Sequence, residues 1–187
     1  MKPLTEFTTK SVKVVELWEP SMDRLSQVLE FVNCLVKEDT FLSFDPKKPI
    51  TFKDEKIWLE GQMDRIKKGN LYLVWAAYNN RIIGSCDLVL GQSPRYRHVA
   101  KIGLMVDKDF RRDGIGRFML EYILKKAKEM KVKIVWLDFF SDNLPAYRLY
   151  KKLGFKEFGR LPNGLYPRFI HIKGLTHKGA DMVCHFE

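Results

Sequence analysis

Residues 98–140 constrain the fold more than any other part of the sequence, because they read as a strand, a turn with two glycines, a helix and a second strand. Apolar residues alternate with others in "HVAKIGLMV", and they recur every three or four positions after Ile115. The later run "KIVWLDFF" is almost continuously apolar, as in an interior strand covered on both faces. A strand, a helix and a strand in this order predict a crossover between two parallel strands.

The remaining sequence also alternates between strand and helix patterns, without a repeat or a Gly/Ser linker. Further strands are expected at residues 11–18, in two runs within 71–91 around a turn at Asn79-Asn80, at 155–161 and at 181–186. Helices are expected at residues 23–37, 53–68 and 115–130, and from Asn143 or Leu144 to a stop at Gly154. The mixture predicts an α/β (mixed α+β) fold.

Length and composition predict a single domain over residues 1–187. Hydrophobic residues make up 45% of the chain, which is enough to bury one sizeable core. The first ten residues have no apolar signal segment, and no stretch approaches the roughly 18 apolar residues of a membrane span. We therefore expect a cytoplasmic protein with no membrane partner. The three cysteines (Cys34, Cys86, Cys184) form no CxxC, so neither a disulfide framework nor a metal site is expected.

The net charge of +10 is concentrated around the glycine turn, where residues 95–133 contain 12 basic and 5 acidic residues. Clustered Lys and Arg bind the phosphates of nucleic acids in a salt-sensitive way. A local anion site explains the same concentration. Nucleic acid is therefore not the expected partner, and a nucleic-acid-binding module is kept as an alternative of another class.

The glycine turn is best explained as a pyrophosphate site. Backbone amides at a helix N-terminus form a cradle for anions, and the helix dipole adds about half a positive charge there. Glycines at positions 114 and 116 let a ligand approach the backbone. A plain surface turn with Gly114 at positive φ is the simpler alternative. A dinucleotide-binding fold is a third, but Met119 stands where its third glycine belongs.

Two motifs together resemble the GNAT superfamily of N-acetyltransferases. The acetyl-CoA motif of that family, R/Q-x-x-G-x-G/A after a strand, is matched by Arg111, Gly114 and Gly116. The second motif is matched by Asn143, Ala146, Leu149-Tyr150 and Gly154-Phe155. The order of elements agrees over nearly the whole chain. The resemblance implies the GNAT fold, a central mixed and largely antiparallel sheet of about six to seven strands with a parallel central pair, flanked by about four helices.

The resemblance implies acetyl-CoA as cosubstrate, with no metal. The backbone of Leu104, Met105 and Val106 would pair with the pantetheine arm. Asn143 would bind the same arm, and it can also serve as a helix N-cap. The pyrophosphate would lie on the turn, whose residues are Arg111, Arg112, Asp113, Gly114, Ile115, Gly116 and Arg117.

Tyr150 resembles the general acid of the family, which donates to the departing CoA sulfur. A packed aromatic residue on an amphipathic helix is the alternative interpretation. A tyrosine of pKa about 10 and a thiol of about 8.5 make full proton transfer uphill by about 2 kcal/mol. A hydrogen bond to the developing thiolate would therefore be its main contribution.

The general base is not assigned by the resemblance. Many family members place a Glu in the strand before the turn, but this chain has Lys101 near that position. His98 and Asp138 are the two candidates, with a strand-edge residue and a solvated strand end as their plainer interpretations. A base matters most for a lysine-like amine, since its deprotonation at pH 7 costs roughly 4.6 kcal/mol, against about 1.4 kcal/mol for an α-amino group.

The leading hypothesis is an N-acetyltransferase that transfers the acetyl group to a primary amine of a small molecule or a protein by direct attack in a ternary complex. The basic residues Arg95, Arg97 and Lys101 favour an acidic acceptor or an amine of low pKa over a polycation. Alternatives are a protein N-terminal or lysine acetyltransferase and a noncatalytic acyl-CoA-binding module. A second copy of the chain is a candidate partner.

Overall fold

The computed structural model describes residues 2–38, 45, 47–160 and 179–185 of the 187-residue chain, the last segment by its backbone only. The strands are β1 (Thr5–Thr8), β2 (Val14–Trp18), β3 (Leu71–Tyr78), β4 (Arg81–Leu90), β5 (Val99–Val106), β6 (Ile134–Phe140), β7 (Lys156–Gly159) and β8 (Gly179–His185). The α-helices are α1 (Leu25–Glu38), α2 (Phe52–Lys67), α3 (Ile115–Glu129) and α4 (Leu144–Lys152). One-turn 3-10 helices are η1 (Met22–Arg24) and η2 (Lys108–Phe110).

The strands of the described residues form one sheet in the order β1-β2-β3-β4-β5-β6-β8-β7. Only β5 and β6 pair in parallel, and the other neighbours are antiparallel. The expected mixed fold and its parallel central pair are confirmed. The sheet has eight strands rather than six to seven. The strand that was not expected is β1, whose four residues are too few for a periodicity argument.

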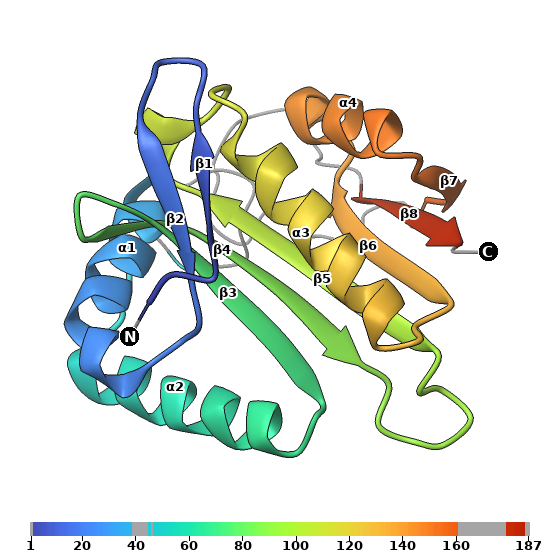
Figure 1. The fold of residues 1–187 in the computed structure, drawn as a ribbon, viewed down its shortest axis with the longest axis horizontal. Coiled ribbons are helices and arrows are strands. Elements are labelled where there is room, and N and C mark those ends of the chain that lie inside the picture. The colour runs from blue at the N-terminus through green and yellow to red at the C-terminus, as the bar shows by residue number, and fades with distance from the viewer. Residues whose placement is uncertain (1, 39–44, 46, 161–178, 186–187) are drawn as a thin grey trace.

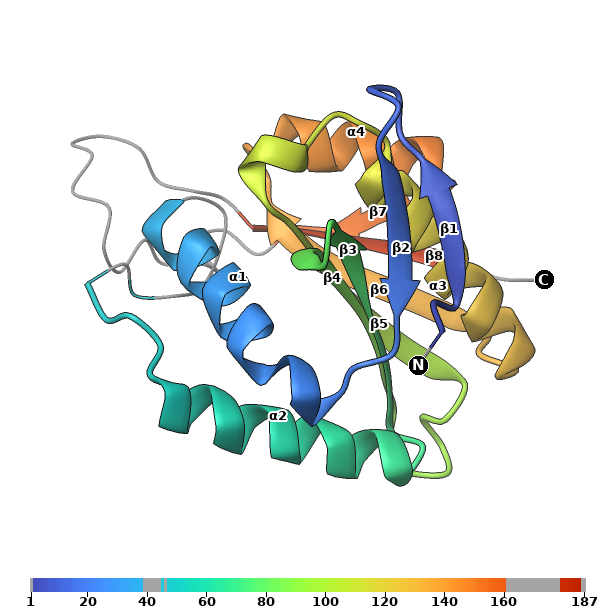
Figure 2. The same cartoon turned by 60° about the vertical axis from the view of Figure 1, so that its left-hand side comes forward.

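Two helical layers cover the sheet. Figures 1 and 2 show α1 and α2 on one face, and α3 and α4 on the other. One core joins α3 and Tyr150 of α4 to the sheet, while a second core joins α1 and Leu59 of α2 to the opposite face. The two cores divide the residues of each central strand by alternation, with Ala100 and Ile102 in the first and Met105 packed against the second. We call these sides the α3/α4 face and the α1/α2 face.

Local signals in the sequence explain where several elements begin and end. Asn79 and Asn80 both have positive φ, as a tight hairpin turn between β3 and β4 requires. Thr51 and Asp54 form a capping box at the start of α2. At its end Gly69 has φ of +68°, and the amides of Gly69 and Asn70 bond back to the helix carbonyls. These caps set where α2 begins and ends.

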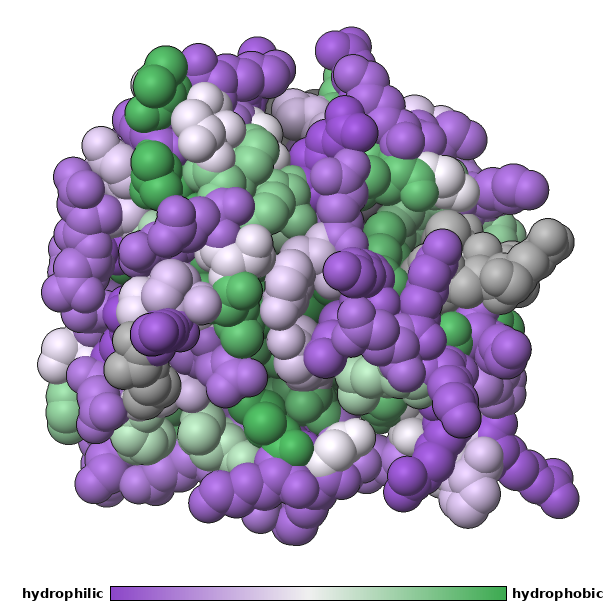
Figure 3. All heavy atoms as spheres, in the orientation of Figure 1, coloured by the Kyte–Doolittle hydropathy of each residue, from purple (hydrophilic) through white to green (hydrophobic). Residues whose placement is uncertain are grey.

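Hydrophilic side chains cover most of the α3/α4 face, and the hydrophobic patches on it are small and separate (Figure 3). One such patch lies over the β1–β2 turn, where Val12 is 80% exposed. No helix in the described part of the chain has both the length and the hydropathy needed to cross a bilayer.

Candidate active site

The glycine turn presents free amides at the start of α3. Gly114 has φ of +94° and is the N-cap of the helix, and Arg112 has φ of 63°. The first bond of the helix runs from the Phe118 amide to the Gly114 carbonyl, at 3.0 Å. Within the described residues, the amides of residues 114–117, at the N-cap and in the first turn of the helix, donate to no protein group. Such amides, together with the helix dipole, can bind an anion.

Two carboxylates hold the first half of the turn. The buried Asp107 binds Arg81 at 2.6 Å and accepts from the Asp109 amide at 3.0 Å. Glu38, at the end of α1, binds Arg111 at 2.5 Å and accepts from the Lys108 amide at 3.3 Å. These bonds tie the turn both to β4 and to the α1/α2 layer.

The β1–β2 turn holds the second half. Asp113 accepts from the Ser11 amide at 2.9 Å and from the Ser11 hydroxyl, and these bonds lower the pKa of Asp113. The Lys10 amide donates to the Asp113 carbonyl at 3.4 Å. Phe7 stacks on Phe118 with ring centroids 4.7 Å apart. The unexpected strand β1 therefore supports the turn.

Phe7 also explains the glycine at position 114. A Cβ at Gly114 would lie 3.0 Å from the Phe7 ring, in addition to the strain of its positive φ. A Cβ at Gly116 would make an ordinary contact with Leu104 at 3.4 Å. The first glycine is thus required by the turn itself, while the second is not.

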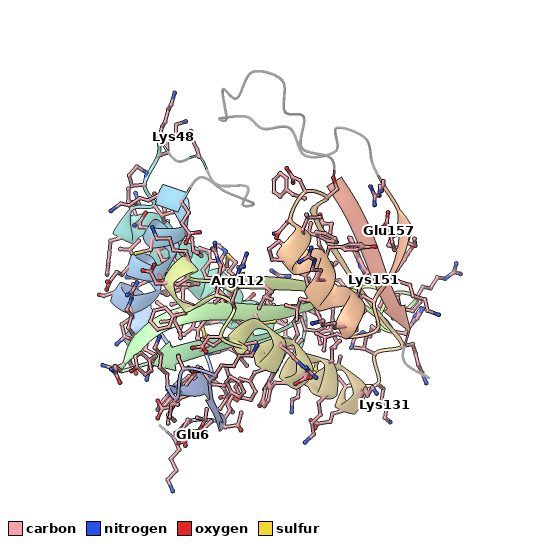
Figure 4. All side chains as sticks on the ribbon, turned by 90° about the horizontal axis from the view of Figure 1, so that it is seen from above. Glu6, Lys48, Arg112, Lys131, Lys151 and Glu157 are labelled. Carbon is pink, nitrogen blue, oxygen red and sulfur yellow. The ribbon has the colours of Figure 1, made fainter. Side chains whose placement is uncertain are left out.

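The three arginines of the turn have different partners. The Nε atom of Arg111 donates to the Val106 carbonyl at 2.8 Å, in addition to the Glu38 ion pair. Arg117 binds Glu121 one helical turn later, at 2.8 Å. Arg112 has no hydrogen bond or ion pair to any other described residue. Figure 4 shows Arg112 at this end of the sheet, between α1 and α4.

Strands β5 and β6 separate just below the turn. Their parallel register covers only the pairs from Val99 with Ile134 to Lys101 with Trp136. Beyond Lys101, β5 remains registered with β4, and β6 remains registered with β8. The edge of β5 that contains Leu104–Val106 is therefore not paired with β6. The loops that follow both strands lie at this same end of the sheet.

Tyr150 enters this region from α4. Its side chain is buried and packs against Phe139 and Phe155, with ring centroids 5.3 and 5.7 Å apart. Burial raises the pKa of Tyr150 well above its ordinary value, and the nearby Cys86 and Asp138 raise it further. Cys86 belongs to β4 and Asp138 to β6, so the Tyr150 phenol is close enough to both strands to interact with their ionisable groups. It stays protonated at neutral pH and can donate a hydrogen bond.

Asn143 is the N-cap of α4. Its side-chain oxygen accepts from the Ala146 amide at 3.2 Å, so the N-cap interpretation is confirmed. The side-chain amide nitrogen can still donate to a ligand at this edge.

The sequence model of the acetyltransferase (GNAT) family matches residues 35–155, more than half of the chain and the segment that contains the turn, the open edge and Tyr150. The chain belongs to this family. GNAT enzymes are acetyl-CoA-dependent N-acetyltransferases, and this chain is one of them.

Individual relatives show where the similarity lies. The chain is 30% identical over 118 residues to the L-amino acid N-acetyltransferase AaaT of Escherichia coli, which covers 60% of this chain and 71% of that protein. It is 37% identical over 54 residues to the alanine N-acetyltransferase of ribosomal protein bS18 from Escherichia coli, or 29% of this chain and 36% of that protein. The structure of yncA from Salmonella typhimurium with acetyl-CoA has a TM-score of 0.74, 16% identity, and covers 92% and 94% of the two chains.

The α1/α2 face of this GNAT enzyme carries a group of charged residues beside the open edge. Lys101 of β5 binds Asp138 of β6 at 2.5 Å, and its ammonium lies 4.7 Å from the centroid of the Trp136 ring. Asp138 is thus in an ion pair with Lys101, two residues beyond Trp136, the last residue of β6 that is registered with β5. The ion pair between Lys101 and Asp138 cannot be read from the sequence, because it depends on the register of β5 with β6.

Asp87 of β4 also lies on this face, and the sequence did not predict it as a site residue. It pairs with Gly103 of β5, and a Cβ at Gly103 would overlap its carboxylate. Burial raises the pKa of Asp87 to about 6, although Arg65 and Lys101 act to lower it. An Asp within a strand does not by itself indicate a functional site. Only the register of β4 with β5 shows that Asp87 lies over Gly103.

His98 lies at the other end of β5. It is exposed in the loop before the strand, and its carbonyl accepts from the amides of Lys133 and Ile134. A strand of eight residues puts it about 20 Å or more from the turn. The geometry therefore gives no support to His98 as a base. Arg95 and Arg97 lie in the same exposed loop, so Lys101 is the one cation of that predicted trio beside the open edge.

The described residues contain no group of three or more His, Cys, Asp or Glu side chains placed to hold a metal ion.

Proposed function

We propose that this GNAT enzyme transfers the acetyl group of acetyl-CoA to a primary α-amino group by direct attack in a ternary complex. The observation that carries the proposal is the separation of β5 from β6 beyond Lys101, which leaves the edge of Leu104–Val106 open next to the turn. An extended pantetheine arm can pair with such an edge, as an added strand does. Acetyl-CoA supplies a thioester at the end of that arm.

The glycine turn fits the pyrophosphate. The free amides of residues 114–117 and the N-terminal end of α3 supply donors and positive potential, and Arg112 supplies a guanidinium. Arg111 acts differently in this proposal, because its bonds to Val106 and Glu38 set the shape of the turn. Asn143 donates its side-chain amide to the pantetheine arm.

Tyr150 stabilises the sulfur that leaves. Its protonated phenol is buried in the core against which Leu104 and Val106 of the open edge also pack, and a hydrogen bond to a developing thiolate strengthens as charge accumulates on sulfur. This role needs no complete proton transfer in the step itself.

An α-amino group is the acceptor that the α1/α2 face favours. The cations Lys101 and Arg65 on this side suit an acceptor that carries a carboxylate, and the relative AaaT acts on L-amino acids. A free amino acid is therefore the first candidate. The N-terminus of a protein is the second, in line with the bS18 relative. Both present amines that cost only about 1.4 kcal/mol to deprotonate at pH 7.

The free thiols of Cys34 and Cys86 support a reducing compartment, so we place the reaction in the cytoplasm.

The test is a thiol-release assay with acetyl-CoA and a panel of acceptors: free L-amino acids, their amides, short peptides and spermidine. We expect free amino acids to give the highest rates, followed by peptide N-termini. Much faster turnover of spermidine would contradict the acceptor class. No thiol release with any amine, in a protein that binds CoA, would contradict the proposed reaction.

A further inference from the structure

We infer that Asp87, from β4, is the general base that accepts a proton from the acceptor amine, and that it reaches the reaction across the missing side chain of Gly103 of β5. The inference rests on the proposed function and adds a catalytic residue to it. Neither motif of the sequence contains Asp87, and neither of the bases expected from the sequence is this residue.

The position of Asp87 along the sheet supports this role. Asp87 pairs with Gly103, and its neighbour Cys86 pairs with Leu104 on the open part of β5. Successive residues of a strand point to opposite faces, about 3.3 Å apart along the chain. Cys86 belongs to the core of the α3/α4 face with Tyr150, so Asp87 points to the α1/α2 face at the same level. A base and an acid thus flank one stretch of β5 from its two sides.

Gly103 gives the carboxylate its access. Any side chain at this position would occupy the place of the Asp87 carboxylate, because a Cβ there would overlap its Oδ1 atom. The carboxylate therefore leans over the backbone of β5 toward the edge that β6 leaves open. From there it can contact an amine directly or through one water molecule.

The surroundings of Asp87 leave it able to take a proton. None of the described residues forms a hydrogen bond or an ion pair with its carboxylate. The charged groups near it are Arg65 from α2 and Lys101 from β5, and Lys101 is itself paired with Asp138 of β6. Asp138 is the weaker candidate base, since its carboxylate already binds an ammonium group.

The burial of Asp87 improves the proton transfer. Its pKa is raised to about 6. Transfer from an α-ammonium of pKa about 8 is then unfavourable by a factor of about 100, against about 10,000 for an ordinary carboxyl of pKa near 4. Asp87 is nevertheless ionised at pH 7.5, as a base must be.

The proposed step is balanced as follows. Asp87 takes one proton from the bound ammonium group, which leaves a neutral amine. The nitrogen forms a bond to the thioester carbonyl carbon while the carbon–sulfur bond breaks and its electron pair stays on sulfur. A second N–H proton ends on the sulfur, which gives the free thiol, and Asp87 releases its proton to solvent. Tyr150 donates its hydrogen bond to the sulfur throughout.

The test compares Asp87→Asn, Asp138→Asn and the wild-type enzyme, with Asp64→Asn as control, since Asp64 is exposed on α2 and pairs with Lys68. Rates are measured from pH 6 to 9 with the fastest acceptor of the panel. We expect Asp87→Asn to lower kcat/KM by about 100-fold or more at pH 7 and by less at pH 9, where the amine is already neutral. CoA affinity, measured by calorimetry, should stay within about threefold, and Asp64→Asn should behave like the wild type.

Two further measurements keep the inference falsifiable. The carboxyl carbon of Asp87, followed by NMR in the free enzyme, should titrate near pH 6. Gly103→Ala keeps the carboxylate but displaces it, and it should show the same pH-dependent loss. An Asp87→Asn deficit that is constant with pH, or a pH-dependent deficit in Asp138→Asn instead, would overturn the inference. If the wild type turns over while Asp87→Asn is unaffected, the inference fails and the proposed function stands.

Discussion

The glycine turn and the α1/α2 face beside β5 use carboxylates in opposite ways. At the turn, Asp107, Glu38 and Asp113 each accept from a backbone amide and from a side chain. On the α1/α2 face, Asp87 is half-buried beside Gly103 without a hydrogen bond from the described residues. One set of carboxylates fixes a backbone, and the other carboxylate keeps its capacity to bind a proton.

The difference indicates that the carboxylates of the turn contribute to stability, whereas Asp87 on the α1/α2 face is suited to a chemical role. Satisfied carboxylates restrain the turn, so its free amides need less ordering to receive an anion. A partly desolvated carboxylate without a donor lowers stability, and carboxylates with a perturbed pKa are common at functional sites. Substitutions in the two regions should therefore have opposite effects on stability.

The largest expected effect is a gain of stability in Asp87→Asn. Because burial raises the pKa of Asp87 to about 6, the unfolded chain, with a pKa near 3.8, releases this proton at lower pH than the folded protein. The Asp87 carboxylate thus destabilises the fold increasingly as pH rises from about 4 to 6, by up to about 3 kcal/mol above that range. Urea unfolding at pH 7.5 should show the variant to be more stable by 1 to about 3 kcal/mol.

The gain should disappear at low pH. At pH 4 most of the folded wild type has a protonated Asp87, so the two proteins should unfold at nearly the same urea concentration. Asp64→Asn on the exposed side of α2 is the matched control, for which no such pH-dependent gain is expected. A destabilised Asp87→Asn at pH 7.5 would show that Asp87 is a satisfied structural carboxylate like those of the turn.

Tyr150→Phe should give the next largest effect, on rate rather than on stability. Loss of the hydroxyl removes the hydrogen bond to the leaving sulfur, and we expect turnover to fall by about 100-fold with CoA affinity unchanged. Tyr147→Phe, on the same helix and also packed against Phe139, is the control and should keep the wild-type rate. Equal rates for Tyr150→Phe and the wild type would remove Tyr150 from the chemistry.

Two glycine substitutions test the backbone of the turn. Gly114→Ala places a Cβ at positive φ, 3.0 Å from Phe7, and should cost about 1 to 2 kcal/mol of stability as well as CoA affinity. Gly116→Ala makes only ordinary contacts and should be neutral or slightly stabilising. Thermal melts and calorimetry with CoA check both variants. Similar losses in the two would show that the turn does not depend on the conformation of Gly114.

The smallest expected effect comes from the β1–β2 turn. Ser11→Ala removes the hydroxyl that donates to Asp113 but keeps the amide that donates to the same carboxylate. We expect CoA to bind about two- to fivefold more weakly, with turnover at saturation unchanged. Ser26→Ala on the exposed side of α1 serves as the control. A change in turnover without a change in CoA affinity would contradict a supporting role for Ser11.

The turn and the fold could be predicted because their signals are local in sequence. A strand, two glycines and an amphipathic helix follow one another directly, and Gly114 needs its positive φ for reasons within that segment and its helix. The Asn79-Asn80 turn and the caps of α2 are equally local. The contribution of β1 was missed because Phe7 and Ser11 act on residues about a hundred positions away.

The arrangement of residues on the α1/α2 face could not be predicted, because it depends on contacts between strands and not on signals that are local in sequence. Asp87, Gly103 and Asp138 come from three strands, and only the register shows which carboxylate lies over a glycine and which is already paired with Lys101. His98 looked suitable because it is close in sequence to the strand of the site. The length of β5 separates it from the turn.

The most direct test of the account is an NMR titration of the ¹⁵N-labelled protein with CoA and, in parallel, with pantetheine, which has no pyrophosphate. We expect CoA to shift the amide signals of residues 112–117 and of Leu104–Val106, while pantetheine shifts only the second group. If CoA binds and the signals of residues 112–117 do not move, the turn does not hold the pyrophosphate.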